Sequence, residues 1–270
     1  MHKRSFLVAL IAALGISAAF ADTLDDIKQR GTLMVGIEAG GTGAIIATEP
    51  GGKIVGQDAD LNALIASKLG VKLQMVETAW PGIIPALLSK RFDMIMSGMT
   101  ASKARAERVN FSTPYGDASL VAATLSSNAA IKGPDDLSGK TVAVLLGSSV
   151  VEFVKQFNIK LQEKKLPLVT VKTYDDFPSV FVDLGNKNID AAILPRPFLG
   201  GYMVQKPGVF KIVEGLGDKS YFAVAARKDD TALINAVNKI LMDAKTDGTL
   251  TALQKKWLGA PTGPLPDSWN

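Results

Sequence analysis

Residues 60–96, DLNALIASKLGVKLQMVETAWPGIIPALLSKRFDMIM, carry the pattern that decides the fold. Apolar side chains recur at helical spacing through residues 60–69, and a glycine follows them as a stop signal. Residues 71–76 and 92–96 are apolar runs typical of strands, and Pro81 opens a second helix between them. This alternation predicts an α/β fold in which helices cross over a sheet.

The same alternation extends to both sides of this stretch. It begins with a short polar helix over 22–30 and a buried strand over 32–37, and it starts again after residues 111–118. Two α/β units of about 100 residues each are the size of ordinary domains. Because open α/β sheets bind ligands beyond the carboxyl ends of their strands, we expect a ligand cleft between two lobes. Further segments follow the pattern: strands over 141–146, 168–173, 189–194 and 222–226, helices over 150–157 and 180–184, and amphipathic helices around 233–241 and 250–257.

The first 21 residues have the features of a secretory signal. Residues 2–4 are basic, residues 6–16 are apolar, and Ala-Phe-Ala at 19–21 is a small-x-small cleavage site. A membrane anchor is the alternative, but the apolar run is shorter than the roughly 20 residues that span a bilayer. We therefore expect cleavage after Ala21 and a mature protein in a bacterial periplasm.

The composition limits the chemistry that the chain can perform. It has 270 residues, no cysteine, and a single histidine, His2, which lies inside the expected signal. Serine–histidine and cysteine–histidine relays, thiolate or imidazole metal sites and disulfides are therefore excluded for the mature chain. Carboxylates, amines, hydroxyls, guanidinium groups and the backbone remain. No cofactor and no metal are expected.

The charge argues against a nucleic-acid partner. Loss of the signal removes Lys3 and Arg4 but no acid, which lowers the formal net charge from +4 to +2. No run of basic residues is interleaved with aromatic residues. The remaining charges are distributed as on an ordinary solvated surface.

Several strings, in order and spacing, resemble the polar-amino-acid solute-binding proteins, the periplasmic receptors of ABC importers. The resemblance covers nearly all of the mature chain. The strings are LMVGIE at 33–38, GQDADL at 56–61, WPGIIPAL at 80–87, FDMIMSGMT at 92–100, RA at 105–106, FSTPY at 111–115, LSGK at 137–140, DGT at 247–249 and KWLG at 256–259.

The resemblance implies a type II periplasmic-binding-protein fold with two α/β lobes, each a mixed sheet flanked by helices, and a ligand cleft between them. Lobe 1 would comprise 22–114 and 222–270, and lobe 2 would comprise 120–216. The crossovers would be 115–119 and 217–221. Ligand binding would close the lobes by a hinge motion, and a membrane ABC permease would recognise the closed monomer.

The resemblance places a carboxylate clamp at Arg105. A guanidinium offers paired donors that match a carboxylate, and the family's Ser-Gly-x-Thr…Arg spacing is present from Ser97 to Arg105. Thr100 would add a hydroxyl and a backbone contact, and Gly98 would add a backbone group. The alternative from the residues alone is that Arg105 is one of several surface charges on a helix.

Four further residues are expected on the ligand. Ser148 and Ser149 lie in a strand-to-helix turn whose N–H groups suit an anion, although Ser149 and Glu152 also form the pattern of a capping box. Trp80 stands where relatives have an aromatic wall, with a core tryptophan as the alternative. Glu38 stands where many relatives have an acid on the ligand side chain, with a solvated loop acid as the alternative.

The departures from the family pattern bear on the ligand. Most relatives have an aspartate for the ligand's α-ammonium after the strand over 189–194, whereas this chain has Pro195 followed by Arg196. An ammonium that is buried without an anion costs several kcal/mol. Either Glu38 supplies the anion, or the ligand is an N-substituted amino acid or an organic acid whose second anionic group meets Arg196.

Other functions remain as alternatives to a binding protein. Some relatives are periplasmic dehydratases, and Glu38 is the one residue we can place as a general acid. A sensor-type binding protein is a third hypothesis. Metal binding by the acidic pairs Asp58/Asp60 and Asp175/Asp176 is less favoured, because each pair lies at an expected helix entrance, where acids stabilise the helix dipole. We expect a receptor and not an enzyme.

Overall fold

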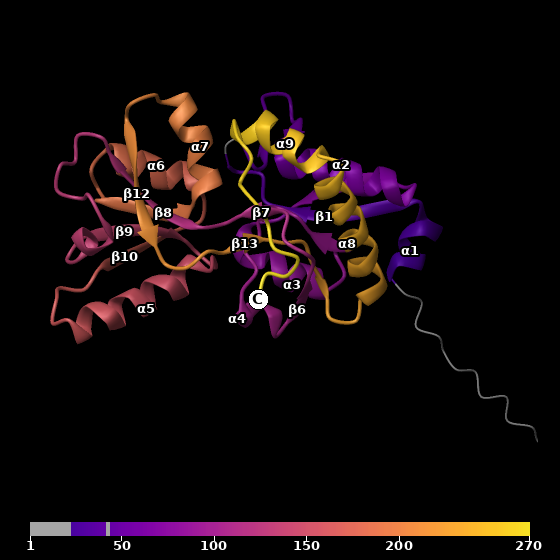
Figure 1. The fold of residues 1–270 in the computed structure, drawn as a ribbon, viewed down its shortest axis with the longest axis horizontal. Helices are drawn as coiled ribbons and strands as arrows, with labels where there is room; N and C mark the ends of the chain where they lie inside the picture. The colour runs from indigo at the N-terminus through magenta and orange to yellow at the C-terminus, as the bar shows by residue number, and fades with distance from the viewer. Residues whose placement is uncertain (1–22, 42–43) are drawn as a thin grey trace, which may run out of the picture.

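Two five-stranded sheets organise the chain into two α/β lobes in the computed structural model, which describes residues 23–41 and 44–270 (Figure 1). The expected signal over 1–21 lies outside the described residues. In the described part of the chain, none of the helices is long and apolar enough to cross a membrane. The α/β class expected from the strand and helix alternation is confirmed.

The first sheet combines segments from both ends of the described chain. Its order is β4-β1-β5-β14-β6, with β1 parallel to β4 and β5 and with β14 antiparallel to β5 and β6. A C-terminal strand therefore lies inside a sheet that is otherwise built from the N-terminal part of the chain. The strands are β1 (Thr32–Ile37), β4 (Lys72–Glu77), β5 (Met94–Ile95), β6 (Val109–Phe111) and β14 (Ala225–Arg227).

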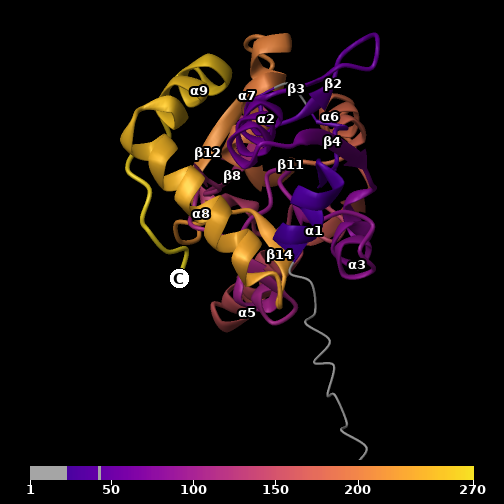
Figure 2. The ribbon, with the colours of Figure 1, turned by 90° about the vertical axis from the view of Figure 1, so that its right-hand side faces the viewer.

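Amphipathic helices cover this sheet. In α2 the apolar residues Leu61 and Ile65 are fully buried, and Gly70 ends the helix in the left-handed conformation with φ of 73°. Helices α8 and α9 pack against α2 and run along one side of the lobe (Figure 2). The remaining elements here are short. The bounds are α1 (Thr23–Arg30), β2 (Ala47–Thr48), β3 (Ile54–Val55), α2 (Gln57–Leu69), the 3₁₀ helix η1 (Trp80–Gly82), α3 (Ile83–Leu88), α4 (Lys103–Ala106), α8 (Thr231–Thr246) and α9 (Thr249–Leu258).

The second sheet has the order β10-β9-β11-β8-β12. Strand β9 is parallel to β10 and β11, and β8 is antiparallel to β11 and β12, so this sheet is mixed. The elements are β8 (Leu120–Leu125), the 3₁₀ helix η2 (Pro134–Leu137), β9 (Thr141–Leu145), α5 (Val150–Glu163), β10 (Thr170–Tyr174), α6 (Phe177–Gly185), β11 (Ala191–Pro195), α7 (Arg196–Gln205) and β12 (Phe210–Leu216).

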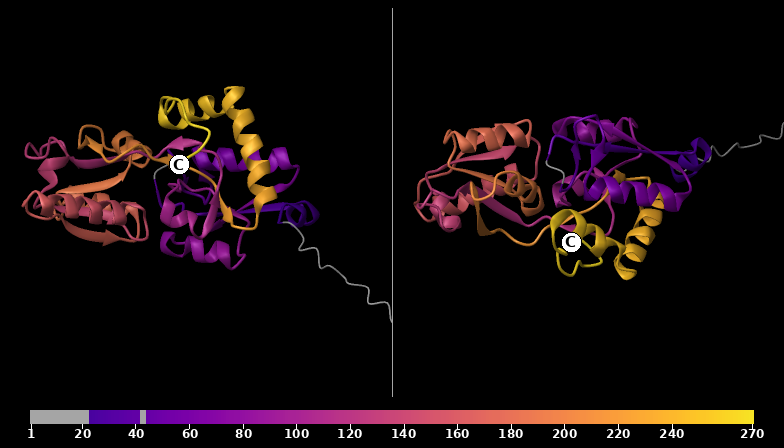
Figure 3. Two further views of the ribbon diagram at one scale, coloured as in Figure 1. Left: turned by 60° about the horizontal axis from the view of Figure 1, so that its bottom comes forward. Right: turned by 90° about the horizontal axis from the view of Figure 1, so that it is seen from above.

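Two extended segments run between the lobes (Figure 3). They contain β7 (Gly116–Asp117) and β13 (Tyr221–Phe222), which pair antiparallel. The pairing continues outward, because Ala118 N donates to Ser220 O at 2.8 Å. The expected single strand over 222–226 is therefore wrong: β13 and β14 are separate, and they belong to different sheets. The crossover ranges 115–119 and 217–221 stay a prediction.

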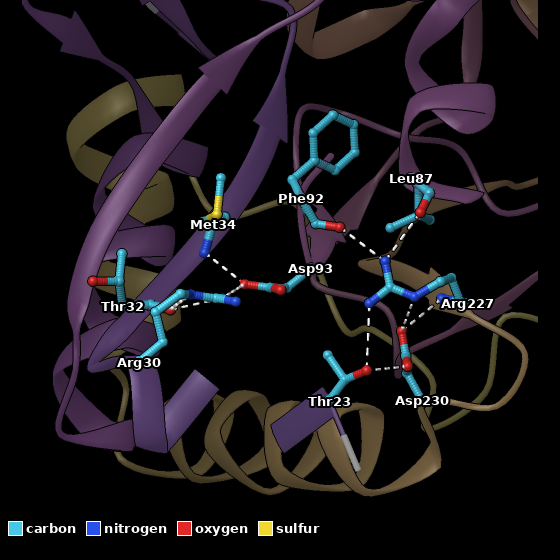
Figure 4. A network of polar contacts seen from close by, with 9 residues as sticks. All are labelled: Thr23, Arg30, Thr32, Met34, Leu87, Phe92, Asp93, Arg227 and Asp230. Atoms are coloured by element: carbon cyan, nitrogen blue, oxygen red, sulfur yellow. Dashed lines mark hydrogen bonds and ion pairs between the residues drawn. The ribbon is translucent and has the colours of Figure 1, made fainter. Parts of the chain in front are cut away.

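A polar network fastens the first helix to the C-terminal part of lobe 1 (Figure 4). Arg227 Nη1 donates to the carbonyls of Leu87 and Phe92 at 3.0 and 2.8 Å, and its Nε lies 2.9 Å from Asp230 Oδ2. Thr23 Oγ1 of α1 donates to the other oxygen of Asp230 at 2.5 Å. Residues about two hundred positions apart are thus joined in one partly buried cluster.

Candidate ligand-binding site

A cavity lies where strand ends of the two lobes face each other. Glu38 directly follows β1, Ser97 follows β5, Ser148 follows β9, and Pro195 ends β11. Strand ends are where open α/β sheets place their ligands. The lining consists of Glu38, Trp80, Ser97, Gly98, Thr100, Arg105, Leu145, Ser148, Ser149, Val150, Phe177, Pro195 and Phe198, and it includes every expected site residue except Arg196.

Arg105 reaches across the cavity from the short helix α4. Its Nη1 donates to Thr100 O at 2.8 Å, and its Nη2 donates to Gly147 O of the other lobe at 3.2 Å. Its Cζ lies 5.5 Å from the centroid of the Trp80 ring, within the range of a cation–π contact. Burial lowers the pKa of Arg105 to about 10, which still leaves it charged at neutral pH. Within residues 23–41 and 44–270, no carboxylate forms an ion pair with it.

The turn after β9 presents two serine hydroxyls to the cavity. Ser148 Oγ is buried and has no hydrogen-bond partner among the described residues. Ser149 is the N-cap residue of α5, but its side chain caps no backbone N–H. The expected capping box is therefore wrong, because the carboxylate of Glu152 instead accepts a hydrogen bond from Gln156 one turn further along the helix. Both hydroxyls are left to the cavity.

Glu38 is the one acid on the lining. Its backbone is held by Ser97, whose Oγ accepts from Glu38 N at 2.9 Å and donates to Glu38 O at 3.1 Å. Burial raises the pKa of Glu38, the Gly40 N–H that donates to its carboxylate opposes this, and the negative charges of Asp176 and Glu77 raise the pKa further. A cation placed here would offset both the cost of burying the charged carboxylate and its repulsion by the two neighbouring acids.

Asp58 holds Gly98 of the cavity lining in place by a hydrogen bond, a role that the sequence analysis missed. Its Oδ2 accepts from Gly98 N at 2.6 Å and from the Tyr115 hydroxyl at 2.7 Å, and the residue is fully buried. Burial raises the pKa of Asp58 to about 7. The Gly98 N–H is thus occupied, so the backbone group that Gly98 can offer a ligand is its carbonyl. Only the three-dimensional proximity of Asp58 to Gly98 and Tyr115 reveals this.

Aromatic rings form much of the wall. Trp80, expected on the ligand, is 7% exposed and lies on the lining. Phe177 and Phe198 of the second lobe also line the cavity, with ring centroids 5.0 Å apart. The sequence analysis did not single them out, because an isolated phenylalanine at a helix start has no feature that separates a cavity wall from ordinary core.

Arg196 lies apart from the cavity lining. Its guanidinium forms an ion pair with Glu214 of β12, and its side chain is 48% exposed. It begins α7, so its neighbour Pro195 faces the cavity while Arg196 faces solvent. This geometry does not support a second anion site at Arg196.

The acidic pairs have structural partners. Asp60 accepts from Trp257 Nε1 and from Lys256 Nζ, each at 2.7 Å, and Asp176 caps α6 by accepting from Ser179 N at 2.7 Å. The described residues contain no cluster of three or more acidic side chains with the geometry of a metal site.

Comparison with known proteins agrees with this architecture. The sequence profile of the bacterial extracellular solute-binding proteins, family 3, matches residues 33–260. The L-cystine-binding protein TcyJ of Escherichia coli strain K12 is 34% identical over 257 residues, which cover 94% of this chain and 92% of that protein.

Solved structures give the same result. An ancestral arginine-binding protein bound to arginine is 37% identical with a TM-score of 0.76, covering 85% of this chain and 99% of that one. The ancestral amino acid-binding protein AncCDT-1, a precursor of cyclohexadienyl dehydratase, is 33% identical with a TM-score of 0.75, covering 87% and 99%. With the two-lobed fold and the profile match over most of its length, the chain belongs to the bacterial extracellular solute-binding proteins of family 3.

Proposed function

We propose that this protein is the periplasmic substrate-binding component of an ABC importer. It captures an amino acid or a related small carboxylate by closing its lobes and presents the closed form, as a monomer, to a membrane permease. The observation that carries the proposal is Arg105, a half-buried guanidinium that is held by carbonyl oxygens and has no acidic partner in the described residues. Export with cleavage after Ala21 belongs to the same proposal.

The carboxylate of the ligand is assigned to Arg105 and the hydroxyls around it. Thr100 on one lobe and Ser148 and Ser149 on the other can donate to the same anion. A charged hydrogen bond between a guanidinium and a carboxylate is about twice as strong as a neutral one. An anion that contacts residues of both lobes stabilises the closed arrangement over the open one.

The rest of the ligand is limited by Glu38 and Pro195. Pro195 offers no charge, so a cationic group on the ligand has Glu38 as its one anionic partner on the lining. The ligand therefore either places its cation at Glu38 or carries none. A neutral α-amino acid whose single ammonium reaches Glu38 satisfies the first condition, and N-acylated amino acids or simple organic acids satisfy the second.

The lobe boundaries follow from the same proposal. Lobe 1 is assigned to 22–114 with 222–270 and lobe 2 to 120–216. The hinge is assigned to 115–119 and 217–221. The paired strands β7 and β13 support this assignment, because they form a small ladder separate from both large sheets.

A thermal-shift screen tests the function. The panel contains L-cystine, L-arginine, L-glutamine, N-acetyl-L-glutamine, succinate and buffer alone. A ligand at 100 times its Kd raises the free energy of unfolding by about 2.7 kcal/mol, which is a clear shift in melting temperature. Arg105→Ala should abolish the shift, whereas Arg196→Ala should keep it. A shift that survives in Arg105→Ala would refute the assigned carboxylate site.

Two observations favour a second candidate, a dehydratase on the same scaffold. Burial raises the pKa of Glu38, which suits a general acid, and one of the similar structures is the precursor of a cyclohexadienyl dehydratase. Against it, Glu38 is the one acid on the lining, and the mature chain has no histidine. Product formation from arogenate or prephenate, lost in Glu38→Gln, would establish the enzyme.

A further inference from the structure

The missing side chain of Gly98 leaves a space that a ring from the other lobe fills. A Cβ atom at Gly98 would lie 2.4 Å from Cζ and 2.9 Å from Cε2 of Phe198. Gly98 follows β5 of the first sheet, whereas Phe198 lies in the first turn of α7, after β11 of the second sheet. This contact therefore joins the two lobes directly.

Phe198 also contacts its own lobe and the connection between the lobes. Its ring centroid is 5.0 Å from that of Phe177 in α6 and 5.8 Å from that of Phe222 in β13, the latter edge to face with an interplanar angle of 79°. The residue is only 8% exposed. Its burial thus depends on lobe 1, lobe 2 and a crossover strand at once.

The surface around Gly98 that contacts the Phe198 ring is held in place by residues outside lobe 2. Gly98 has φ of 64°, and Asp58 and Tyr115, both fully buried, hold its N–H. Ile45 of the same lobe lies 3.1 Å from the position of a Cβ at Gly98. The space that Phe198 enters is therefore bounded, on the side of Gly98, by residues outside lobe 2.

We propose that Phe198 is a positioning residue for ligand capture: its ring docks on Gly98 only when the lobes close, and this contact sets how tightly the closed form holds a ligand. The proposal rests on the proposed function. It adds a contact between protein groups that contributes to affinity beyond the groups that touch the ligand. Any side chain at Gly98 would block it.

Three glycine-to-alanine variants, compared without ligand, test whether the contact between Phe198 and Gly98 forms only when the lobes close. Gly36→Ala is the matched control within one lobe, because its Cβ would lie 2.4 Å from the ring of Phe92. Gly70→Ala measures backbone strain alone, since Gly70 has φ of 73° and open space around its Cβ position. In thermal unfolding, Gly98→Ala should melt only slightly below Gly70→Ala, because its Cβ would also lie 3.1 Å from Cγ2 of Ile45, and Gly36→Ala should melt far lower. A Gly98→Ala protein as unstable as Gly36→Ala would refute the proposal.

A double-mutant cycle tests the effect on binding. Calorimetry with L-cystine, L-arginine and N-acetyl-L-glutamine gives the Kd for the parent protein, Gly98→Ala, Phe198→Ala and the double variant. Gly98→Ala should weaken binding about tenfold or more in the parent, because side chains in contact couple by up to a few kcal/mol. In the Phe198→Ala background the same change should cost clearly less, since the clashing ring is absent and only the backbone strain and the close contact with Ile45 remain.

The outcomes of these experiments distinguish failure of the Phe198 proposal from failure of the proposed binding function. An equal loss from Gly98→Ala in both backgrounds would mean that Gly98 acts on the ligand and not on Phe198, which overturns the inference. If the parent protein binds none of the probes, the proposed function is weakened, while the ligand-free comparison of the three glycine variants still decides whether the contact is conditional.

Discussion

The guanidinium of Arg105 has carbonyl oxygens, and no carboxylate, as its hydrogen-bond partners in the described residues. Two carbonyl oxygens orient it, one from each lobe, and neither carries a charge to compensate it. A carboxylate would do so, and the planar group can bind it with two parallel hydrogen bonds. On the proposed function, the ligand carboxylate is the negative charge that Arg105 lacks among the described residues.

Arg105→Lys tests the geometry as well as the charge. Lysine keeps the positive charge but cannot hold Thr100 O and Gly147 O while it also binds a carboxylate with paired donors. For the compound that stabilises the parent protein in the thermal-shift screen, we expect the free energy of binding to weaken by about 2–5 kcal/mol. This is the usual cost of disrupting a buried charged hydrogen bond. Calorimetry measures it, with Arg91→Lys, an exposed residue outside the cavity lining, as the control. Unchanged affinity would show that charge alone suffices.

Asp58 should make stability depend on pH. Its pKa in the folded protein is raised to about 7 by burial, against about 3.9 in an unfolded chain. The folded state therefore binds this proton more tightly, so stability from this group is full below about pH 4 and is lost as the pH rises through about 7. No histidine follows residue 21 to mask the effect.

Urea unfolding between pH 4.5 and 8 measures this dependence. Asp58→Asn removes the titrating group and should flatten the fall in the free energy of unfolding as the pH rises. Asp183→Asn is the control, because hydrogen bonds from Lys172, Tyr174 and Asn188 hold the pKa of Asp183 below its usual range. Its stabilising effect is lost only below about pH 4, so this variant should keep the slope of the parent between pH 4.5 and 8. An Asp58→Asn protein with the same slope as the parent would show that Asp58 does not titrate in this window.

At the scale of elements, the network around Arg227 joins helix α1, strand β14 and the start of α8. Asp230 is 5% exposed and accepts from Thr23 as well as pairing with Arg227. Removal of Arg227 leaves that carboxylate buried without its cation and takes the guanidinium donor from the carbonyls of Phe92 and Leu87, of which Leu87 O still accepts from Lys90 N. Such a loss is typically strongly destabilising.

Arg227→Met should therefore lower the free energy of unfolding by about 3–5 kcal/mol in urea titration. Lys239→Met is the matched control, since Lys239 pairs with Asp243 on the exposed face of α8, and exposed pairs contribute about 0–1 kcal/mol. A small effect at Arg227 would mean that water replaces the guanidinium. The length of the methionine side chain keeps the packing comparable.

Elements with one strong periodicity could be predicted from sequence, and elements with mixed signals could not. Strand β1 over 32–37 and helix α2 with its terminal glycine match the pattern of apolar residues. Strand β12 was missed because Gly215 and a register shift between Val213 and Leu216 interrupt its alternation. Helix α7 was missed because prolines at 195 and 197 resemble a turn, although proline is well tolerated in a first helical turn.

The candidate site divides in the same way. Residues with a characteristic spacing, such as Thr100 and Arg105, could be assigned from sequence and do lie on the cavity. Asp58 and Phe198 could not, because their roles arise from contacts across about 40 and 100 residues of chain. Arg196 differs from both: it is adjacent to Pro195 in sequence, but it lies off the cavity lining and its side chain pairs with Glu214.

At the scale of the whole molecule, the two lobes meet closely enough to be joined covalently. A Cβ at Gly147 in lobe 2 would lie 3.6 Å from Cβ of Pro81 in lobe 1 and 3.2 Å from its Cα, so the backbone must shift by a few tenths of an ångström to accept it. Disulfides have Cβ separations of about 3.5–4.5 Å, and the chain has no cysteine to interfere. Pro81→Cys with Gly147→Cys should therefore form a disulfide that holds the lobes together.

Locking should stop exchange of the ligand. The oxidised double variant should take up the compound that stabilises the parent protein in the thermal-shift screen far more slowly than the reduced form, since entry requires the lobes to separate. Small-angle scattering of the oxidised protein should give the same radius of gyration with and without that compound. Reduction should restore both exchange and the change in radius. The single variants Pro81→Cys and Gly147→Cys control for substitution at the cavity rim, including the strain that a side chain introduces at Gly147, whose φ is 73°. If the oxidised protein exchanges ligand as fast as the reduced one, the lobes do not act as a gate, and capture would have to proceed by a route that leaves this contact closed.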